Sequence, residues 1–256
     1  MLMHQPGNSY RDRYYGGMVD NDTMSQLYIA VREREKRLVT DEELLKLPEV
    51  DKHHLHYHEW EIRKRSCKHL LAYVAKKNRA LRILEIGCGN GWLCNRLSSV
   101  PQTEVTGIDI NKRELEQACK VFGHRVNLQF IAGDIRHGIL GGNWYDLVVF
   151  AASIQYFPSL IEIISRAKRL LTPNGEIYIT DTMFYSEADV VKAGERSAAY
   201  FNKIGFPGMS ACYFHHPVTK LEYFNYRFLN RPGGLLQKIL KHNDPFYRIV
   251  IKSERI

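Results

Sequence analysis

The 256-residue chain is poor in cysteine: it has five, and no two form a C-x-x-C pair. An odd number without that spacing argues against a disulfide framework and a zinc site, so we expect reduced thiols in a cytoplasmic protein. No stretch approaches the roughly 18 apolar residues of a membrane span. The first ten residues also lack the basic and apolar regions of a secretory signal.

Acidic residues are the scarcer charge: 28 against 36 basic residues give a formal net charge of +8. Basic residues crowd the first third of the chain, in REREKR at 32–37, RKR at 63–65 and KKNR at 76–79. Such runs suit either a nucleic-acid surface or solvated helix faces. Because glutamates are interleaved at 32–37, we favour solvated faces, and a nucleic-acid partner stays the alternative.

The pattern of the chain changes near residue 81. Residues 1–20 resemble a loose arm, and helical patterns then follow at 24–38 and 58–77, with a capping box of Thr40 and Glu43 between them. After residue 81, short apolar segments rich in β-branched residues alternate with helical ones. This alternation predicts a parallel sheet with helices on both faces and ligands at the carboxyl ends of its strands.

A glycine-rich turn, ILEIGCGNGW at 83–92, follows the first of these strands. It is not a phosphate-binding P-loop, because no Lys-Ser or Lys-Thr follows it. A dinucleotide fingerprint needs a small third residue for close helix packing, and Trp92 occupies that position. Glycines at alternate positions instead let the backbone approach an adenosyl and amino-acid group closely.

The turn and the strands after it resemble the class I S-adenosylmethionine-dependent methyltransferases, from about Leu81 to Thr182. The resemblance implies a mostly parallel seven-stranded sheet, a helical extension at 1–57 and a methyltransferase domain at 58–256. It also implies S-adenosylmethionine as cofactor, with Asp109 on the ribose hydroxyls and Asp134 on the adenine amino group. The other cofactor contacts it implies are Glu85, Gly87, Cys88, Gly89, Gly91, Ile110, Ile135 and Ala151.

The helix at 58–77 carries Arg63 on its apolar stripe, where an arginine is costly unless something neutralises it. A guanidinium can grip a carboxylate with two parallel hydrogen bonds. We therefore expect Arg63 to hold the cofactor's methionine carboxylate. The alternative is that its head reaches solvent or a glutamate such as Glu59.

Several acceptor classes lack their motifs. No [DNS]-P-P-[YFW] follows the fourth strand, no Pro-Cys pair exists, and no paired glutamates occupy the loop. These absences argue against enzymes of this family that methylate base amines, cytosine carbon or arginine. Only Asp181 is placed for a metal-dependent mechanism, so we expect no metal.

The segment 184–217 after the fifth strand is an insertion that we expect to form a lid over the acceptor. It ends in His215 and His216, and imidazole titrates near neutral pH, so these are the candidate general bases, with Tyr156 as a further catalytic candidate. The sequence thus predicts a methyltransferase for a small molecule. The alternatives are a tRNA or protein methyltransferase docking through its basic N-terminal helices, or a non-catalytic cofactor-binding subunit. Neither the acceptor nor the oligomeric state is fixed.

Overall fold

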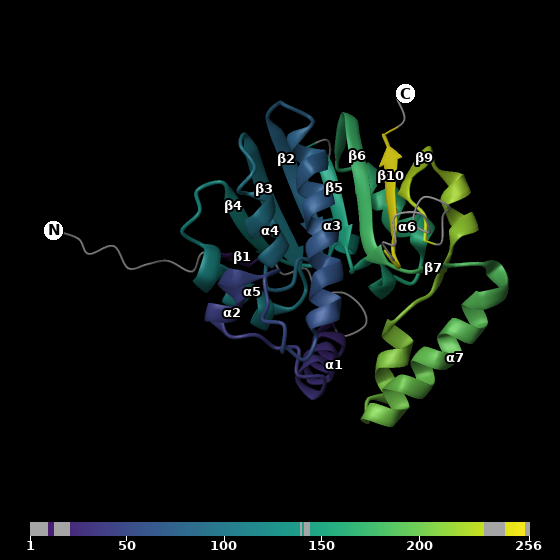
Figure 1. Cartoon of the computed structure of the whole chain (residues 1–256). Coiled ribbons are helices and arrows are strands. Elements are labelled where there is room, and N and C mark those ends of the chain that lie inside the picture. The colour runs from purple at the N-terminus through teal and green to yellow at the C-terminus, as the bar shows by residue number, and fades with distance from the viewer. Residues whose placement is uncertain (1–9, 13–20, 139, 141–143, 233–243, 254–256) are drawn as a thin grey trace.

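A computed structural model describes residues 10–12, 21–138, 140, 144–232 and 244–253. Its centre is a sheet with the strand order β1-β4-β3-β2-β5-β6-β10-β9 (Figure 1). The parallel strands are found where the sequence predicts them, beginning with the strand that leads into the glycine-rich turn. They are β2 (Leu81–Ile86), β3 (Thr103–Asp109), β4 (Leu128–Ala132), β5 (Tyr145–Ala151) and β6 (Leu171–Thr182). Together with β9 (Tyr226–Asn230) and β10 (Tyr247–Lys252), they confirm the predicted seven-stranded, mostly parallel sheet.

Strand β1 (Tyr10–Asp12) adds an eighth strand at one edge, parallel to β4. The sequence predicts only a loose arm over residues 1–20, and this short strand corrects that expectation for its three residues. The rest of the expected arm lies outside the described residues.

The last strand differs from its expected position. From the sequence, 245–254 is an edge strand, but β10 lies between β6 and β9 and is antiparallel to both. Its residues Ile249, Val250 and Ile251 are fully buried, which requires cover on both faces and a neighbour on both sides. Strand β9, whose residues are all at least partly exposed, forms the edge instead.

The sequence Pro173-Asn174-Gly175 is typical of a turn, but in the structure it forms a bulge within β6. The pairing with β5 moves from Tyr145 opposite Leu171 to Leu147 opposite Glu176, so three residues of β6 are extra in the register. A bulge lets a strand bend without leaving its sheet.

Two layers of helices cover the sheet. Helices α3 (Tyr57–Ala75), α4 (Trp92–Leu97) and α5 (Lys112–Phe122) share a buried cluster with one face, and α6 (Leu160–Lys168) shares another with the opposite face. Neighbouring strand residues alternate between the two clusters, as Ile83 and Leu84 do, because side chains alternate across a strand.

Two further helices precede α3 and lie at the end of the sheet where the parallel strands terminate (Figure 1). Helix α1 spans Asn21–Arg34 and α2 spans Asp41–Lys46. The predicted capping box is confirmed: Thr40 accepts a hydrogen bond from the Glu43 amide, and the Glu43 carboxylate accepts one from the Thr40 amide.

The insertion begins and ends at one small parallel pair, β7 (Phe184–Tyr185) and β8 (His216–Pro217). Between them lie α7 (Glu187–Ile204) and a 3₁₀ helix, η3 (Pro207–Cys212). A second 3₁₀ helix, η4 (Val218–Tyr223), stands where the sequence suggests a late helix. The insertion projects beyond the sheet on the same side as α1 (Figure 1).

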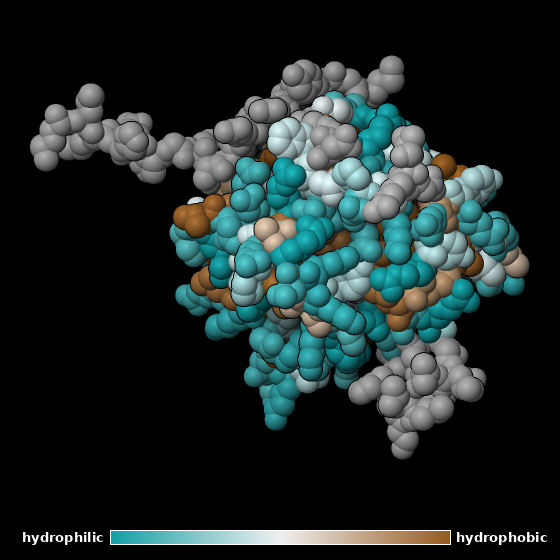
Figure 2. Space-filling model, turned by 90° about the horizontal axis from the view of Figure 1, so that it is seen from above, coloured by the Kyte–Doolittle hydropathy of each residue, from teal (hydrophilic) through white to brown (hydrophobic). Residues whose placement is uncertain are grey.

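The face seen in Figure 2 is mostly hydrophilic, and its apolar residues form separate small groups. Scattered apolar residues are ordinary on a protein surface. Within the described part of the chain, no helix is long and apolar enough to cross a membrane.

Candidate functional site

The turn between β2 and α4 uses all three glycines in left-handed backbone, with φ of 73° at Gly87, 52° at Gly89 and 75° at Gly91. A Cβ at Gly87 would lie 2.5 Å from the Cβ of Ser153, so this position excludes every side chain. Gly91 is the N-cap of α4 and is not among the residues that line the two cavities described below. A Cβ there would lie 2.6 Å from the Phe130 ring, so the glycine lets Phe130 pack against the turn.

Asp109 ends β3 beside the glycine-rich turn. Its Oδ2 accepts a hydrogen bond of 2.8 Å from the Gly89 amide, and its Oδ1 accepts one of 2.8 Å from the Asn111 amide. Burial raises the pKa of Asp109, and these amides act in the opposite direction. Each carboxylate oxygen accepts more than one hydrogen bond, so Asp109 keeps the capacity to receive a diol.

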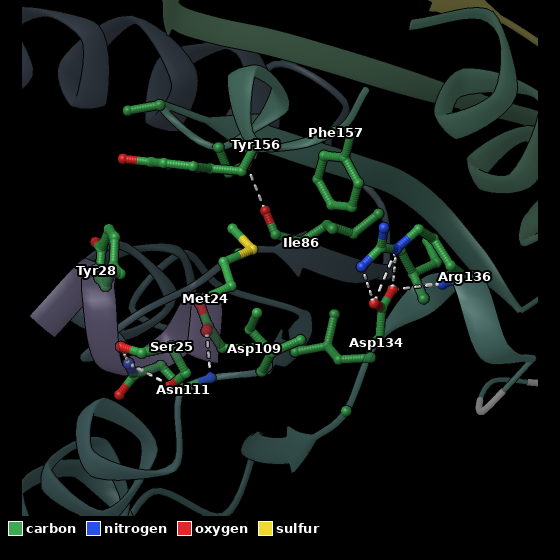
Figure 3. A pocket seen from close by; sticks show the side chains of 17 residues that line it. Met24, Ser25, Tyr28, Ile86, Asp109, Asn111, Asp134, Arg136, Tyr156 and Phe157 are labelled. Carbon is green, nitrogen blue, oxygen red and sulfur yellow. Dashed lines mark hydrogen bonds and ion pairs between the residues drawn. The ribbon is translucent and has the colours of Figure 1, made fainter. Parts of the chain in front are cut away.

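A first cavity lies at the carboxyl ends of β2, β3 and β4, and α1 covers it (Figure 3). Five of the predicted cofactor residues line it: Gly87, Asp109, Ile110, Asp134 and Ile135. The remaining walls come mainly from α1 and from the loop after β5, in the form of Met24, Ser25, Tyr28, Tyr156 and Phe157. The combination of apolar walls and two carboxylates suits a nucleoside.

Asp134 is already engaged by a neighbour that sequence reasoning missed. The Arg136 guanidinium donates to both of its carboxylate oxygens (Figure 3). Nε donates to Oδ1 at 3.1 Å and to Oδ2 at 2.8 Å, and Nη2 donates to Oδ2 at 2.6 Å. The Arg136 amide also donates to Oδ1 at 2.8 Å. An adenine amino group would therefore share this carboxylate with Arg136 or displace it. In the sequence, the only sign of this ion pair is that Arg136 follows Asp134 by two positions.

A second, larger cavity adjoins the first and shares Gly87, Ala152, Tyr28 and Tyr156 with it. Glu85, Cys88, Gly89 and Ala151 line this second cavity. Burial raises the pKa of Glu85 to about 8, and its Oε2 accepts a hydrogen bond of 2.9 Å from the Cys94 thiol. Glu85 is thus largely neutral at neutral pH.

Arg63 lines the second cavity, and its Nε donates to Glu59 at 3.0 Å. The expected alternative partner is therefore present, while the guanidinium still borders the cavity. A second arginine there was not anticipated as a site residue: Arg32 of α1 pairs with Glu114 at 3.3 Å, next to Gly89. Two guanidiniums thus flank the space beside the glycine-rich turn.

The two histidines of the insertion have different surroundings. His215 lines the second cavity, its Nε2 lies 2.9 Å from the Ser197 hydroxyl, and burial lowers its pKa. His216 is buried, lines neither cavity, and its Nε2 donates to the Ile154 carbonyl at 3.2 Å. The structure thus favours His215 over His216 as a group that meets an acceptor.

Tyr156 lies at the junction of the two cavities. Its ring meets that of Tyr28 edge to face at a centroid distance of 5.6 Å, and that of Tyr213 at the same distance. Burial raises the pKa of Tyr156, so its hydroxyl stays protonated and can donate but is a poor base. Tyr156 therefore connects α1, which carries Tyr28, to the lid, which carries Tyr213. From the sequence alone, α1 is only a basic helix.

The family model described as a methyltransferase domain matches residues 77–249. Among curated proteins, a malonyl-[acyl-carrier protein] O-methyltransferase of Halalkalibacterium halodurans is 36% identical over 103 residues. That match covers 39% of this chain and 38% of the relative, so the chain matches well under half of the relative's length.

Solved structures share the fold. A magnesium protoporphyrin IX methyltransferase of Synechocystis, with S-adenosylhomocysteine bound, superposes with a TM-score of 0.58 at 15% identity, covering 92% of this chain and 100% of that one. An S-adenosylmethionine-dependent methyltransferase of Mesorhizobium loti has a TM-score of 0.51 at 15% identity, covering 68% and 91%.

Proposed function

The chain belongs to the methyltransferase domain family and is an S-adenosylmethionine-dependent methyltransferase, and from this premise we propose that it methylates a small molecule in the second cavity. The observation that carries the proposal is the pair of adjoining cavities that share Gly87, Ala152, Tyr28 and Tyr156. One has the walls of a nucleoside site. The other continues past the glycine-rich turn to the lid and has room for a second reactant.

We assign the nucleoside part of the cofactor to the first cavity. Asp109 would receive the ribose hydroxyls, and Ile110 and Ile135 would enclose the adenine ring, with Asp134 at its amino group. Gly87, Cys88 and Gly89 would bring bare backbone against the methionine part, with Arg63 near its carboxylate. The bound sulfonium supplies an activated methyl group, and the protein aligns the acceptor with it.

The first experiment measures S-adenosylhomocysteine binding by calorimetry. Removing the Asp109 carboxylate in Asp109→Ala should weaken binding by about 1.5–3 kcal/mol, the range for hydrogen bonds to charged groups. Glu104→Gln, at the exposed opposite end of the same strand, is the matched control and should bind as the parent does. Equal affinity in a folded Asp109→Ala protein would contradict the assignment.

We also propose that His215 contacts the acceptor from the lid. Its Ala variant should bind S-adenosylhomocysteine normally and lose turnover, while His216→Ala should act through the stability of the buried β7–β8 pair. The measurement is methyl transfer from S-adenosylmethionine to a panel of phenolic, carboxylic and amine acceptors. Normal turnover in His215→Ala would remove this histidine from the mechanism.

A carboxyl acceptor carried on acyl carrier protein is the second candidate, because the similar protein of Halalkalibacterium halodurans is named for that substrate. Adding malonyl-loaded acyl carrier protein to the acceptor panel tests it directly.

A further inference from the structure

Asp181 is a buried carboxylate in the second cavity to which the assignments above give no role. It lies at the end of β6, is only 7% exposed, and lines the cavity with Glu85 and His215. Among the described residues, no group donates a hydrogen bond to its Oδ1. A buried carboxylate oxygen without a partner is costly, and such exceptions gather at functional sites.

The backbone at Asp181 is also unusual. Its φ is 56°, in the left-handed region that non-glycine residues seldom adopt. On the adjacent strand, Ala152 at the end of β5 has a φ of 54° and also lines the cavity. Two such residues side by side where strands end are a local strain of the kind that aims side chains at a site.

Arg63 and Arg32 already have carboxylate partners, while Arg196 of α7, whose charge acts on His215 and Tyr185, also lines the cavity. Arg63 donates to Glu59, and Arg32 pairs with Glu114. A negatively charged acceptor deep in the cavity would therefore meet the Asp181 carboxylate, whose Oδ1 has no donor among the described residues, while Arg63 and Arg32 are each held by a glutamate.

Aromatic rings line the same space. Tyr156 and Tyr213 meet edge to face at 5.6 Å, and His215 lies between Tyr213 and Tyr185 with centroid distances of 5.4 Å to each. All four line the second cavity. Aromatic faces attract ammonium groups, and these rings line the same cavity as the Asp181 carboxylate, a combination that suits a cation.

We propose that the acceptor is an amine, that the aromatic rings and Asp181 hold its nitrogen, and that Asp181 receives its proton. The inference rests on the proposed function, since it names the substrate class of the same cavity. The amine binds as an ammonium, and one N–H proton first passes to the Asp181 carboxylate, which frees the nitrogen lone pair. The lone pair then forms the new N–CH₃ bond while the S–CH₃ bond breaks and its electron pair stays on sulfur. Asp181 later releases its proton to solvent.

Other charges also face Asp181. Burial raises its pKa to about 6, while the charge of Arg63 and a hydrogen bond from Ser66 lower it, and Asp244 and Glu59 raise it. Such a carboxylate is ionised at neutral pH and close enough to neutrality to accept and release a proton.

The test compares three probes by calorimetry: S-adenosylhomocysteine, S-adenosylmethionine and sinefungin, an analogue with an ammonium in place of the methylsulfonium. Only sinefungin presents N–H donors at the point of transfer. Asp181→Asn keeps the shape, and asparagine tolerates left-handed backbone, so the variant should fold. Glu195→Gln, which removes an exposed carboxylate from α7, is the matched control.

We expect Asp181→Asn to weaken sinefungin binding about tenfold or more, S-adenosylmethionine binding less, and S-adenosylhomocysteine binding not at all, with Glu195→Gln unchanged. Equal weakening of all three probes would place Asp181 at the methionine amino group and overturn the proposal. Equal weakening of the two cations, or no change in a variant with normal melting, would also overturn it. If the parent protein binds none of the three, the proposed function itself fails.

Discussion

At the scale of single residues, Arg63 and Arg32 are both candidates for binding the methionine carboxylate of the cofactor. Both line the space beside the glycine-rich turn, and both already hold a glutamate. The methionine carboxylate of the cofactor needs a cation there, and the sequence pointed only to Arg63. The reason is that Arg32 reaches the turn from α1, and no pattern within a helix reveals which distant loop it will meet.

We expect Arg63→Met to weaken S-adenosylmethionine binding strongly and Arg63→Lys to weaken it partly, because lysine keeps the charge and loses the two-pronged geometry. Adenosine, which lacks the carboxylate, should bind both variants as it binds the parent. Calorimetry with the two ligands measures this, and Arg32→Met is the paired comparison. If Arg63→Met binds S-adenosylmethionine as the parent does while Arg32→Met does not, the carboxylate belongs to Arg32.

Glu85 should make the stability of the ligand-free protein depend on pH. Burial raises its pKa from 4.5 to about 8, with Asp109 and Asp181 nearby adding to the rise. Between those values the folded state holds a proton that the unfolded state has lost. Its contribution is therefore fully present below about pH 4.5 and is lost as pH rises toward 8.

The variant Glu85→Gln keeps an acceptor for the Cys94 thiol and cannot ionise. Relative to it, the parent should lose on the order of a few kcal/mol of unfolding free energy between pH 5 and 8. Urea unfolding at several pH values measures the difference, and Glu104→Gln serves as the exposed control. Parallel stability curves for the parent and Glu85→Gln would show that Glu85 ionises as readily when folded.

At the scale of elements, the lid and α1 are joined. Val31 of α1, Phe201 of α7 and Met209 of η3 form a small buried cluster of their own, separate from the two clusters of the sheet. This cluster, with the partly buried residues around it, is much smaller than either cluster of the sheet, so this part of the fold should open more readily than the sheet. The Tyr200 hydroxyl also donates to Glu35, at the end of α1.

Helix α7 and residues 205–216 should therefore exchange amide hydrogens faster than β5 in the absence of ligand, and should slow when S-adenosylhomocysteine is added. Met209→Ala should speed the exchange of the lid and leave β5 as it was, because it removes part of the small cluster alone. Ile163→Ala, which removes a buried side chain of α6 from the core between that helix and the sheet, is the control and should loosen the sheet instead. Equally slow exchange in lid and β5 without ligand would contradict a mobile lid.

For the whole molecule, what the sequence could predict follows from local patterns. The strands from β2 to β6, the glycine-rich turn and the two acids that end β3 and β4 are each encoded within a few neighbouring residues. The order of strands at the far edge is not local, and so the sequence alone predicts β10 as the edge strand, whereas β9 holds that place. Its fully apolar stretch, Ile249 to Ile251, was the sign of a buried strand.

The candidate site likewise has parts that local sequence patterns predict and parts that depend on how distant elements pack. The cofactor residues predicted on the sheet lie at or just after the ends of strands, and local sequence patterns reveal such positions. The cover provided by Met24, Tyr28 and Arg32 was not found, because it depends on where α1 docks, more than fifty residues before the turn it covers. From the sequence, Asp181 is only a metal candidate, because neither its left-handed backbone nor the missing donor at its Oδ1 is visible there.

The shared wall of the two cavities has a kinetic consequence. Tyr28 and Tyr156 border both spaces, with α1 closing one and the lid closing the other. A nucleoside under α1 would be trapped for as long as a methylated product keeps the lid shut against that helix. We therefore expect an ordered sequence of entry and exit, in which S-adenosylhomocysteine leaves last and inhibits competitively against S-adenosylmethionine. The residence time of this last product would then set the turnover rate.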